Sequence, residues 1–263
     1  MISDARSDTA ILEWNRVLSV TLTDILKDPG SFYYPFDSLT FLSKIRSPDE
    51  KFRIYTWEVP GPERNYLCFG LLQMSGKSKT APCRIFELSD KSNSIPDPQY
   101  QVTDTGHWFG AMYYQLITSR MPDGSTLYTL LGRNRVHPVI SRKVIEILTF
   151  PDEVSPTFGA AVFPENGNGL MKRIIFQYGS NVSMVLRYES QVLLQEKKWN
   201  PSKRSFNIKE SSAPMIVCDH LVPSDPALEG MYEYYIPASD LHNGFLFSKD
   251  HWNFIEDIEA RNK

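Results

Sequence analysis

From residue 52 onward, apolar residues recur at every second position in one short segment after another. In the segment FRIYTWEV (52–59), Tyr55, Trp57 and Val59 share one parity, whereas in SRKVIEILTF (141–150) both parities are largely apolar. Period two is the spacing of side chains on one face of a β-strand, and a helix repeats every 3.6 residues. About a dozen such segments, separated by short turn-forming stretches, predict antiparallel strands rather than alternating βαβ units.

The patterning therefore predicts an all-β fold, mainly antiparallel, arranged as a sandwich or a strongly bent sheet. A β-propeller is the alternative, although no repeat of about 40–45 residues with shared signature residues is present. The segment 141–150 is expected in the middle of a layered sheet, because both of its faces are apolar. Two hairpins are predicted, one over 172–188 that turns at 179–181 and one over 191–210 that turns at 200–203.

The first 47 residues follow a different pattern. Apolar residues over 9–27 have helical spacing, and Asp28-Pro29-Gly30 ends the pattern. A second, shorter helix is predicted from Asp37 through Leu39, Leu42 and Ile45. We expect one domain over 1–263, in which a helical segment, 1–47, packs on an antiparallel β region, 48–263.

Composition excludes several classes of protein. The 263 residues are 41% hydrophobic and 22% charged, which is typical of a folded chain with its own core. A formal net charge of −3 provides no long-range attraction for nucleic acid. No segment approaches the roughly 18 apolar residues of a membrane-spanning helix. Cys68, Cys83 and Cys218 form no disulfide framework, so we expect buried free thiols, with a Cys68–Cys83 bridge as the alternative.

Local catalytic motifs are absent, so catalytic candidates come from single residues on predicted strands. Asp219 and His220 are adjacent, and adjacent strand residues point to opposite faces, so each would need another partner. Glu146 lies on an apolar parity and needs a cation such as Arg173 or Arg187.

Metal ligands are not predicted, although Asp240 and His242 share a strand parity and form the alternative candidate pair. The spacing typical of a zinc or calcium site is missing around them. No cofactor is predicted.

Two loops are the predicted binding surfaces, 89–110 and 132–142. In the first, His107, Trp108 and Phe109 lie between glycines, where they would stack on a sugar or a peptide, or else anchor the loop on the core. The second carries Arg133, Arg135 and His137, followed by Arg142 and Lys143. This group would hold an anion, because guanidinium matches carboxylate or phosphate, or else it is a solvated basic turn.

Five segments carry a resemblance to a known family: SPDEKFRIYTW, YTLLG, SRKVIEILTF, KRIIFQYGSNVSMVLRY and CDHLVP. Together they resemble an uncharacterised family of exported, mostly-β bacterial envelope proteins, over about residues 30–235. The resemblance provides no catalytic residues. It implies an exported protein of the periplasm or cell surface in mature form; a cytoplasmic protein is the alternative.

These observations together favour a non-enzymatic binding or accessory module of the bacterial cell envelope. Its partner would be a protein or a glycan, with peripheral association to the envelope, and recognition would use the loops 89–110 and 132–142. The alternative is a hydrolase acting on glycan or peptide, whose acid and base residues come from distant strands and leave no local motif.

Overall fold

The structure is a computed structural model. It describes residues 2–61, 65–76, 78, 80–135, 137–152, 154–165, 169–200 and 205–258, and for 2–8, 193–200 and 205–211 the backbone alone.

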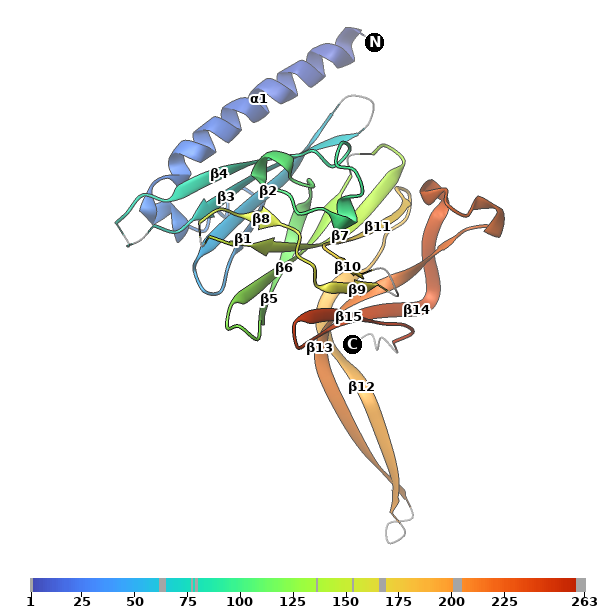
Figure 1. The fold of residues 1–263 in the computed structure, drawn as a ribbon. Helices are drawn as coiled ribbons and strands as arrows, with labels where there is room; N and C mark the ends of the chain where they lie inside the picture. Colours follow the sequence, from blue (N-terminus) through green and yellow to red (C-terminus); the bar gives the residue numbers. More distant parts are fainter. Residues whose placement is uncertain are drawn as a thin grey trace.

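Four antiparallel sheets make up most of the molecule (Figure 1). The first contains β1 (Ser43–Arg46), β2 (Phe52–Pro60), β3 (Tyr66–Met74) and β4 (Arg84–Ser89), in that order. The second has the order β11 (Ile174–Gly179), β7 (Ile140–Thr149), β6 (Thr126–Asn134), β5 (Met112–Arg120), and β8 (Thr157–Phe158) also pairs with β7. The third contains β12 (Leu186–Asn200), β13 (Ser205–Pro223), β14 (Tyr235–Ser248) and β15 (His251–Ile255), and the fourth pairs β9 (Phe163–Glu165) with β10 (Gly169–Met171).

The described residues contain one α-helix, α1 (Ile2–Leu26), and five short 3₁₀ turns. These turns are η1 (Pro29–Phe32), η3 (Pro98–Tyr100), η4 (Thr105–His107), η5 (Pro226–Leu228) and η6 (Tyr232–Tyr234). No helix of the described chain has the length and apolar content needed to cross a membrane, as the composition predicts.

The prediction of a second N-terminal helix is wrong, because residues 43–46 form β1, which pairs with β2. Leu39 and Leu42 belong to the core beneath α1, whereas Ile45 packs against the core on the other face of the first sheet. In a helix, apolar residues at this spacing would all face one side. Here Leu39 and Leu42 lie in or next to a turn and Ile45 lies in a strand, and they pack into two different cores.

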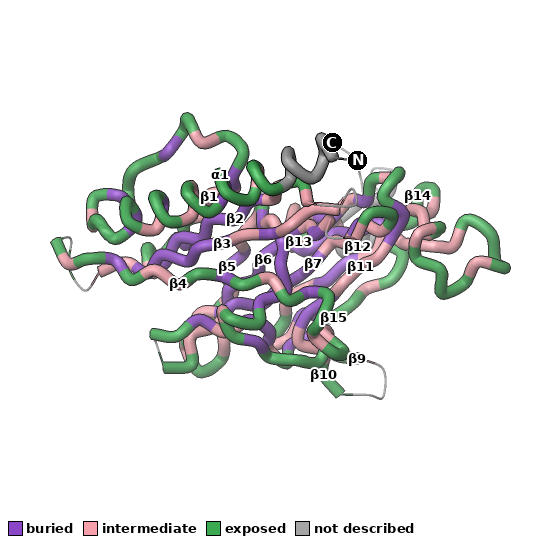
Figure 2. Tube along the Cα trace, turned by 90° about the horizontal axis from the view of Figure 1, so that it is seen from above, coloured by how far each residue is buried: buried purple, intermediate pink, exposed green. Residues whose placement is uncertain are grey.

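Three cores separate the layers of the fold. The first lies between α1 and the first sheet and contains Leu22, Leu26 and Trp57. The second lies between the first and second sheets, and the third between the second and third sheets. In Figure 2, the buried residues concentrate along the strands of these layers. The stacking of sheets over cores agrees with the predicted all-β, mainly antiparallel fold.

Strand β7 lies in the middle of this stack. Its residues Val144 and Leu148 contribute to the core on one side, and Ile145 and Ile147 contribute to the core on the other. Because successive strand residues point to opposite faces, a strand with apolar residues on both parities suits a sheet that is covered twice. The expected position of the segment 141–150 is confirmed.

One of the two predicted hairpins is wrong and the other is confirmed. Strand β11 pairs with β7 and not with β12, so residues 180–185 cross from the second sheet to the third. Strands β12 and β13 do form a hairpin, paired from Leu186↔Cys218 to Asn200↔Ser205. Strand β14 pairs with β13 over Ile216–Pro223 only, and the rest of the hairpin extends away from the body as a two-stranded ribbon (Figure 1).

All three cysteines are free and buried, so the expectation of buried thiols is confirmed. Burial raises the pKa of Cys218 to about 12 and raises the pKa of Cys68 well above its usual value.

Candidate functional site

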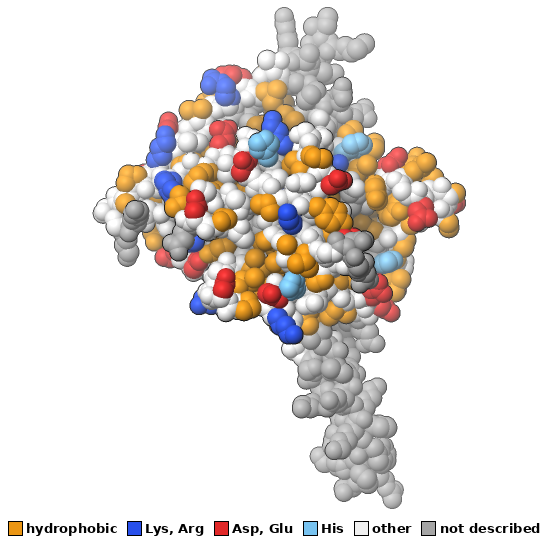
Figure 3. Space-filling model, viewed as in Figure 1, with side chains coloured by type: hydrophobic (Ala, Val, Ile, Leu, Met, Phe, Trp, Pro, Cys, Tyr) orange, Lys and Arg blue, Asp and Glu red, His pale blue; other side chains and the backbone are white. Residues whose placement is uncertain are grey.

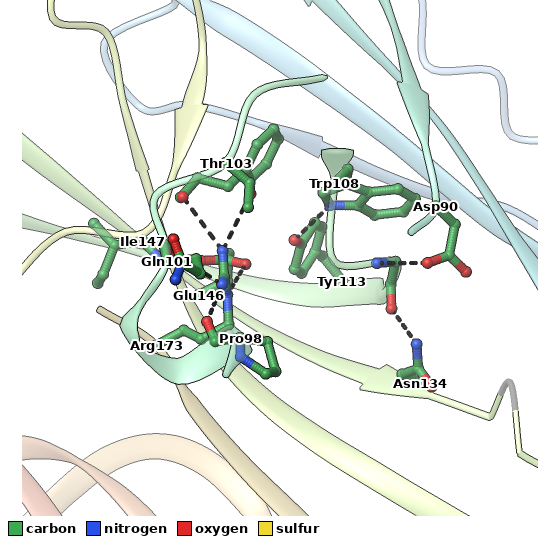
Figure 4. A network of polar contacts seen from close by, with 12 residues as sticks. Asp90, Pro98, Gln101, Thr103, Trp108, Tyr113, Asn134, Glu146, Ile147 and Arg173 are labelled. Carbon is green, nitrogen blue, oxygen red and sulfur yellow. Dashed lines mark hydrogen bonds and ion pairs between the residues drawn. The ribbon is translucent and has the colours of Figure 1, made fainter. Parts of the chain in front are cut away.

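Loop 89–110 is fixed to the second sheet at two places, and the first is a buried ion pair between Glu146 and Arg173. Arg173 Nε donates to Glu146 Oε2 at 2.8 Å, and both side chains are completely buried. The Arg173 guanidinium also donates to the carbonyl oxygens of Pro98 and Gln101 and to Thr103 Oγ1 (Figure 4). Burial raises the pKa of Glu146, and the charge of Arg173 opposes that rise. The pair therefore holds the middle of the loop against the sheet.

The second attachment joins both ends of the loop. Asp90 Oδ1 accepts hydrogen bonds from the backbone N–H of Ser92, at 2.8 Å, and of Gly110, at 3.0 Å. Asn134, at the end of β6, donates to the carbonyl oxygen of Gly110 (Figure 4). It also donates to Ser92 Oγ at 3.4 Å. A Cβ atom at Gly110 would lie 2.2 Å from the Asp90 carboxyl carbon, so this close approach requires glycine.

Between the two attachments the loop covers a hollow of about 350 Å³. Its floor comes from the second sheet, where Arg142 of β7 donates through Nε to Gln177 Oε1 of β11 at 3.2 Å. The complete lining consists of Ser92, Asn93, Ile95, Asp97, Pro98, Gln99, Tyr100, Phe109, Arg142, Ile175 and Gln177. Loop 89–110 thus forms most of this concave surface, and the predicted loop 132–142 contributes only its last residue, Arg142, which lies in β7.

A second hollow, of about 340 Å³, lies on the other side of the turn at Ser92 and Asn93, which line both spaces. It is bounded by β3 and β4 and includes Glu87, Asp90 and the buried Cys68.

The two predicted aromatic binding residues are core residues. Trp108 is fully buried and donates through Nε1 to the Tyr113 hydroxyl at 2.9 Å, and Phe109 is 1% exposed. Both rings anchor the loop on the core, which is the alternative that the sequence left open, and Phe109 adds only a 1% exposed ring to the lining of the hollow. His107 is exposed, and its Nδ1 lies 2.9 Å from Asp104 Oδ1.

The basic residues of loop 132–142 are partly used within the protein. Arg135 Nη2 lies 2.6 Å from Glu58 Oε2, and its guanidinium carbon lies 4.0 Å from the centre of the Tyr66 ring. Arg133 Nη2 lies 3.5 Å from the same Glu58 oxygen, and His137 Nδ1 accepts the N–H of Val139. These three residues do not line the hollow under loop 89–110, whereas Arg142, two residues into β7, does.

The remaining catalytic candidates, Asp219 and His220, have separate partners, as expected for neighbours on a strand. Asp219 Oδ1 lies 3.0 Å from His242 Nδ1, and its Oδ2 accepts the backbone N–H of Val185 at 2.7 Å. His220 Nδ1 lies 3.1 Å from Asn243 Nδ2.

The alternative metal pair, Asp240 and His242, is also corrected by this contact. His242 is the cross-strand partner of Asp219, and its Nδ1 is directed toward that carboxylate, although the geometry is not that of a hydrogen bond. No cluster of three or more potential ligands from His, Cys, Asp and Glu occurs among the residues that the structure describes.

From its apolar parity, Glu146 was predicted to need a cation such as Arg173 or Arg187, and Arg173 is that partner. Sequence reasoning missed two other features, the position of the half-buried Arg142 in the lining of the hollow and the Asp219–His242 pair. Both depend on which strands are neighbours, which no local pattern contains.

The class of protein is defined here by the fold: a mainly antiparallel β protein of stacked sheets with one long N-terminal helix and a loop-covered hollow. No family model, no curated protein and no solved structure matches the chain.

Proposed function

We propose that the protein is a non-enzymatic binding module that recognises a protein or glycan partner through the surface formed by loops 89–110 and 132–142. The observation that carries this proposal is the hollow beneath loop 89–110, at the junction of the two loops. Arg173 and Asp90 hold the loop in place from two sides. A loop that is ordered before binding loses little conformational entropy on association, which favours recognition.

The arrangement of carboxylates supports binding over hydrolysis. Glycoside hydrolysis commonly uses two carboxyl groups that flank one scissile bond. Among the residues described as lining the hollow under the loop, Asp97 is the only carboxylate. The neighbouring hollow has Glu87 and Asp90, but Asp90 is occupied by two backbone N–H groups. Glu146 is enclosed with Arg173 and has no access to a substrate.

Surface charge agrees with a partner other than nucleic acid. On the face of the body shown in Figure 3, the coloured Lys and Arg side chains alternate with Asp and Glu, without a continuous patch of one sign. Recognition of a nucleic acid backbone depends on clustered positive charge.

A bacterial envelope setting remains part of the proposal and is supported by the family resemblance of the five sequence segments. Fractionation of the native cells, with detection of the untagged protein, tests it. Recovery in the periplasmic or envelope fraction is expected, and recovery with the cytoplasmic fraction would contradict it.

A photo-crosslinking amino acid placed on the surface tests the binding function. We expect that the crosslinker at position 93 or 107, replacing Asn93 or His107, captures the partner in native cells. The matched control is position 120, where Arg120 is exposed at the end of β5 and does not line the hollow. Equal capture at all three positions, or none at 93 and 107, would contradict the assignment of this surface.

A further inference from the structure

The side chain of Arg142 is a cation without a counter-charge. Its Nε donates to Gln177, but its Nη1 is buried without a hydrogen-bond partner. No carboxylate of the described residues lies within 4.0 Å of its nitrogen atoms. Burial lowers the pKa of Arg142, and the more distant charge of Asp90 opposes that effect. An enclosed guanidinium that lacks a partner costs free energy, because it has lost water without a replacement.

Every other buried or half-buried arginine in the described part of the chain contacts a carboxylate or several backbone carbonyls. Carboxylates satisfy four of them: Arg133 and Arg135 approach Glu58, Arg173 approaches Glu146, and Arg187 approaches Glu189. Arg53 instead donates through its two terminal nitrogens to three backbone carbonyls, those of Phe32, Tyr34 and Pro35, although its Nε is buried without a hydrogen-bond partner. Arg142 is the exception, and it is also the arginine that lines the hollow.

We infer that the hollow beneath loop 89–110 binds a carboxylate-bearing ligand, whose carboxylate takes Arg142 as its counter-charge. This inference rests on the proposed function of the same surface. A guanidinium presents parallel N–H groups that match the two oxygens of a carboxylate. The volume of about 350 Å³ suits a small ligand or the end of a chain.

The rest of the lining agrees with a ligand of mixed character. Gln99, Gln177 and Asn93 offer amide groups for polar substituents, and Ile95 and Ile175 offer apolar contact. Such a combination of a few polar groups with an apolar wall is typical of ligand sites.

The charges around the hollow favour a single negative charge over a dianion such as phosphate. Asp97 lines the hollow, and the charge of Asp90 acts on Arg142 from beyond ion-pair distance. One guanidinium can neutralise one carboxylate, but the second charge of a dianion would be repelled by these aspartates.

Titration of the isotope-labelled full chain by NMR at constant ionic strength tests the inference. The probes are N-acetylalanine, which mimics a peptide end, glucuronate, which mimics an acidic sugar, and inorganic phosphate as the dianion. We expect saturable shifts at the amides of residues 93–100 with one or both carboxylates, and weaker binding of phosphate. The tighter of the two carboxylates identifies the source of the ligand.

The variant Arg142→Gln should weaken carboxylate binding by about tenfold or more, because a charge-assisted pair is lost. Arg120→Gln, at an exposed arginine at the end of β5, is the matched control and should bind as the natural protein does. The Arg142→Gln variant should also unfold at the same temperature or a higher one, since an uncompensated charge is removed. Arg142→Lys serves as a second variant if the glutamine variant is unstable, and it should also bind more weakly.

Absence of saturable binding by either carboxylate, or unchanged binding in both Arg142 variants, would overturn the inference. Tighter binding of phosphate than of both carboxylates would overturn it as well. The crosslinking experiment distinguishes the failure of this inference from the failure of the proposed function. If no carboxylate binds but the crosslinker at 93 and 107 still captures a partner, the surface binds a partner without a carboxylate at Arg142.

Discussion

At the scale of single residues, burial decides which polar and aromatic side chains are structural. Glu146 and Arg173 are both completely enclosed, and together they attach the loop through backbone carbonyls and Thr103. Trp108 and His107 are neighbours in sequence, yet one is fully buried and the other is exposed. The same loop thus alternates between residues that hold it in place and residues that a partner can reach.

Replacing Glu146 with alanine should destabilise the protein by about 3–5 kcal/mol, because Arg173 would remain buried without its carboxylate. Urea unfolding measures this change, and hydrogen exchange should show faster opening of residues 98–103. The control is Glu87→Ala, at an exposed position on β4, which should change stability by no more than about 0.5 kcal/mol. A loss as small as that of the control would mean that the pair does not hold the loop.

Trp108→Ala should cost about 3–5 kcal/mol in unfolding free energy, because it empties a buried aromatic site and removes a partner of Tyr113. His107→Ala, one residue earlier and exposed, should change stability by about 0.5 kcal/mol or less. Thermal unfolding of the two variants checks this contrast. Comparable midpoints for the two would show that the ring of Trp108 is not part of the core.

At the scale of elements, the ribbon of β12 and β13 differs from every other pair of strands. Within the body, β13 also pairs with β14. The free edge of β12 is bonded by side chains of β5: the Tyr114 hydroxyl donates to the carbonyl oxygen of Leu186, and the Gln115 amide bonds the backbone of Tyr188. On the N-terminal side of Ile216, β13 pairs with β12 alone, without β14. An isolated two-stranded hairpin has marginal stability in water, so the ribbon contributes little to the stability of the body.

Shortening the ribbon should therefore leave the body folded. In the proposed variant, residues 193–211 are removed and Val192 is joined to Ser212, its cross-strand partner, through Asn-Gly. The unfolding free energy should change by about 1 kcal/mol or less, since a long connection is replaced by a tight turn. Circular dichroism during denaturation measures it. As a comparison, Ile216→Ala, within the body on β13, should lower the unfolding free energy by about 2–5 kcal/mol. Loss of folding in the shortened variant would show that the body depends on the ribbon.

At the scale of the whole molecule, the sheets are coupled through shared strands. Strand β7 contributes to two cores, and β2 contributes Phe52 and Ile54 to one core and Tyr55 and Trp57 to the next. Because each middle layer is part of two cores, disruption of one core disturbs its neighbour. We therefore expect one cooperative domain.

Three buried tryptophans report on the three cores: Trp57, Trp108 and Trp252. Incorporation of 5-fluorotryptophan should give separate ¹⁹F signals, which lose intensity at one common denaturant concentration if the molecule is a single unit. A lower midpoint for Trp252 than for the other two would show that the third sheet unfolds independently.

The fold class and most strand positions could be predicted from sequence, because the period of two is a local property. The partners of the strands could not, since pairing depends on contacts between segments far apart in the chain. Residues 172–188 contain β11 and the beginning of β12, which have different neighbours, and Val182 and Met184, predicted to be in a strand, lie in the connection between them. For the same reason, the sequence did not predict that Arg142 lines the hollow or that Asp219 lies beside His242. The need of Glu146 for a cation could be predicted, because its apolar neighbours in the strand are visible in the sequence.

The sequence by itself determined that this chain forms covered antiparallel sheets, that a carboxylate within 141–150 needs an arginine, and that loop 89–110 leaves the regular structure. Alternation, turns and charge on an apolar face are encoded in neighbouring residues. Only the tertiary structure decided that this loop is closed over a hollow and that Arg142 faces it without a counter-charge. Burial and charge balance are sums over residues distant in the chain, so they exist only once the layers have packed.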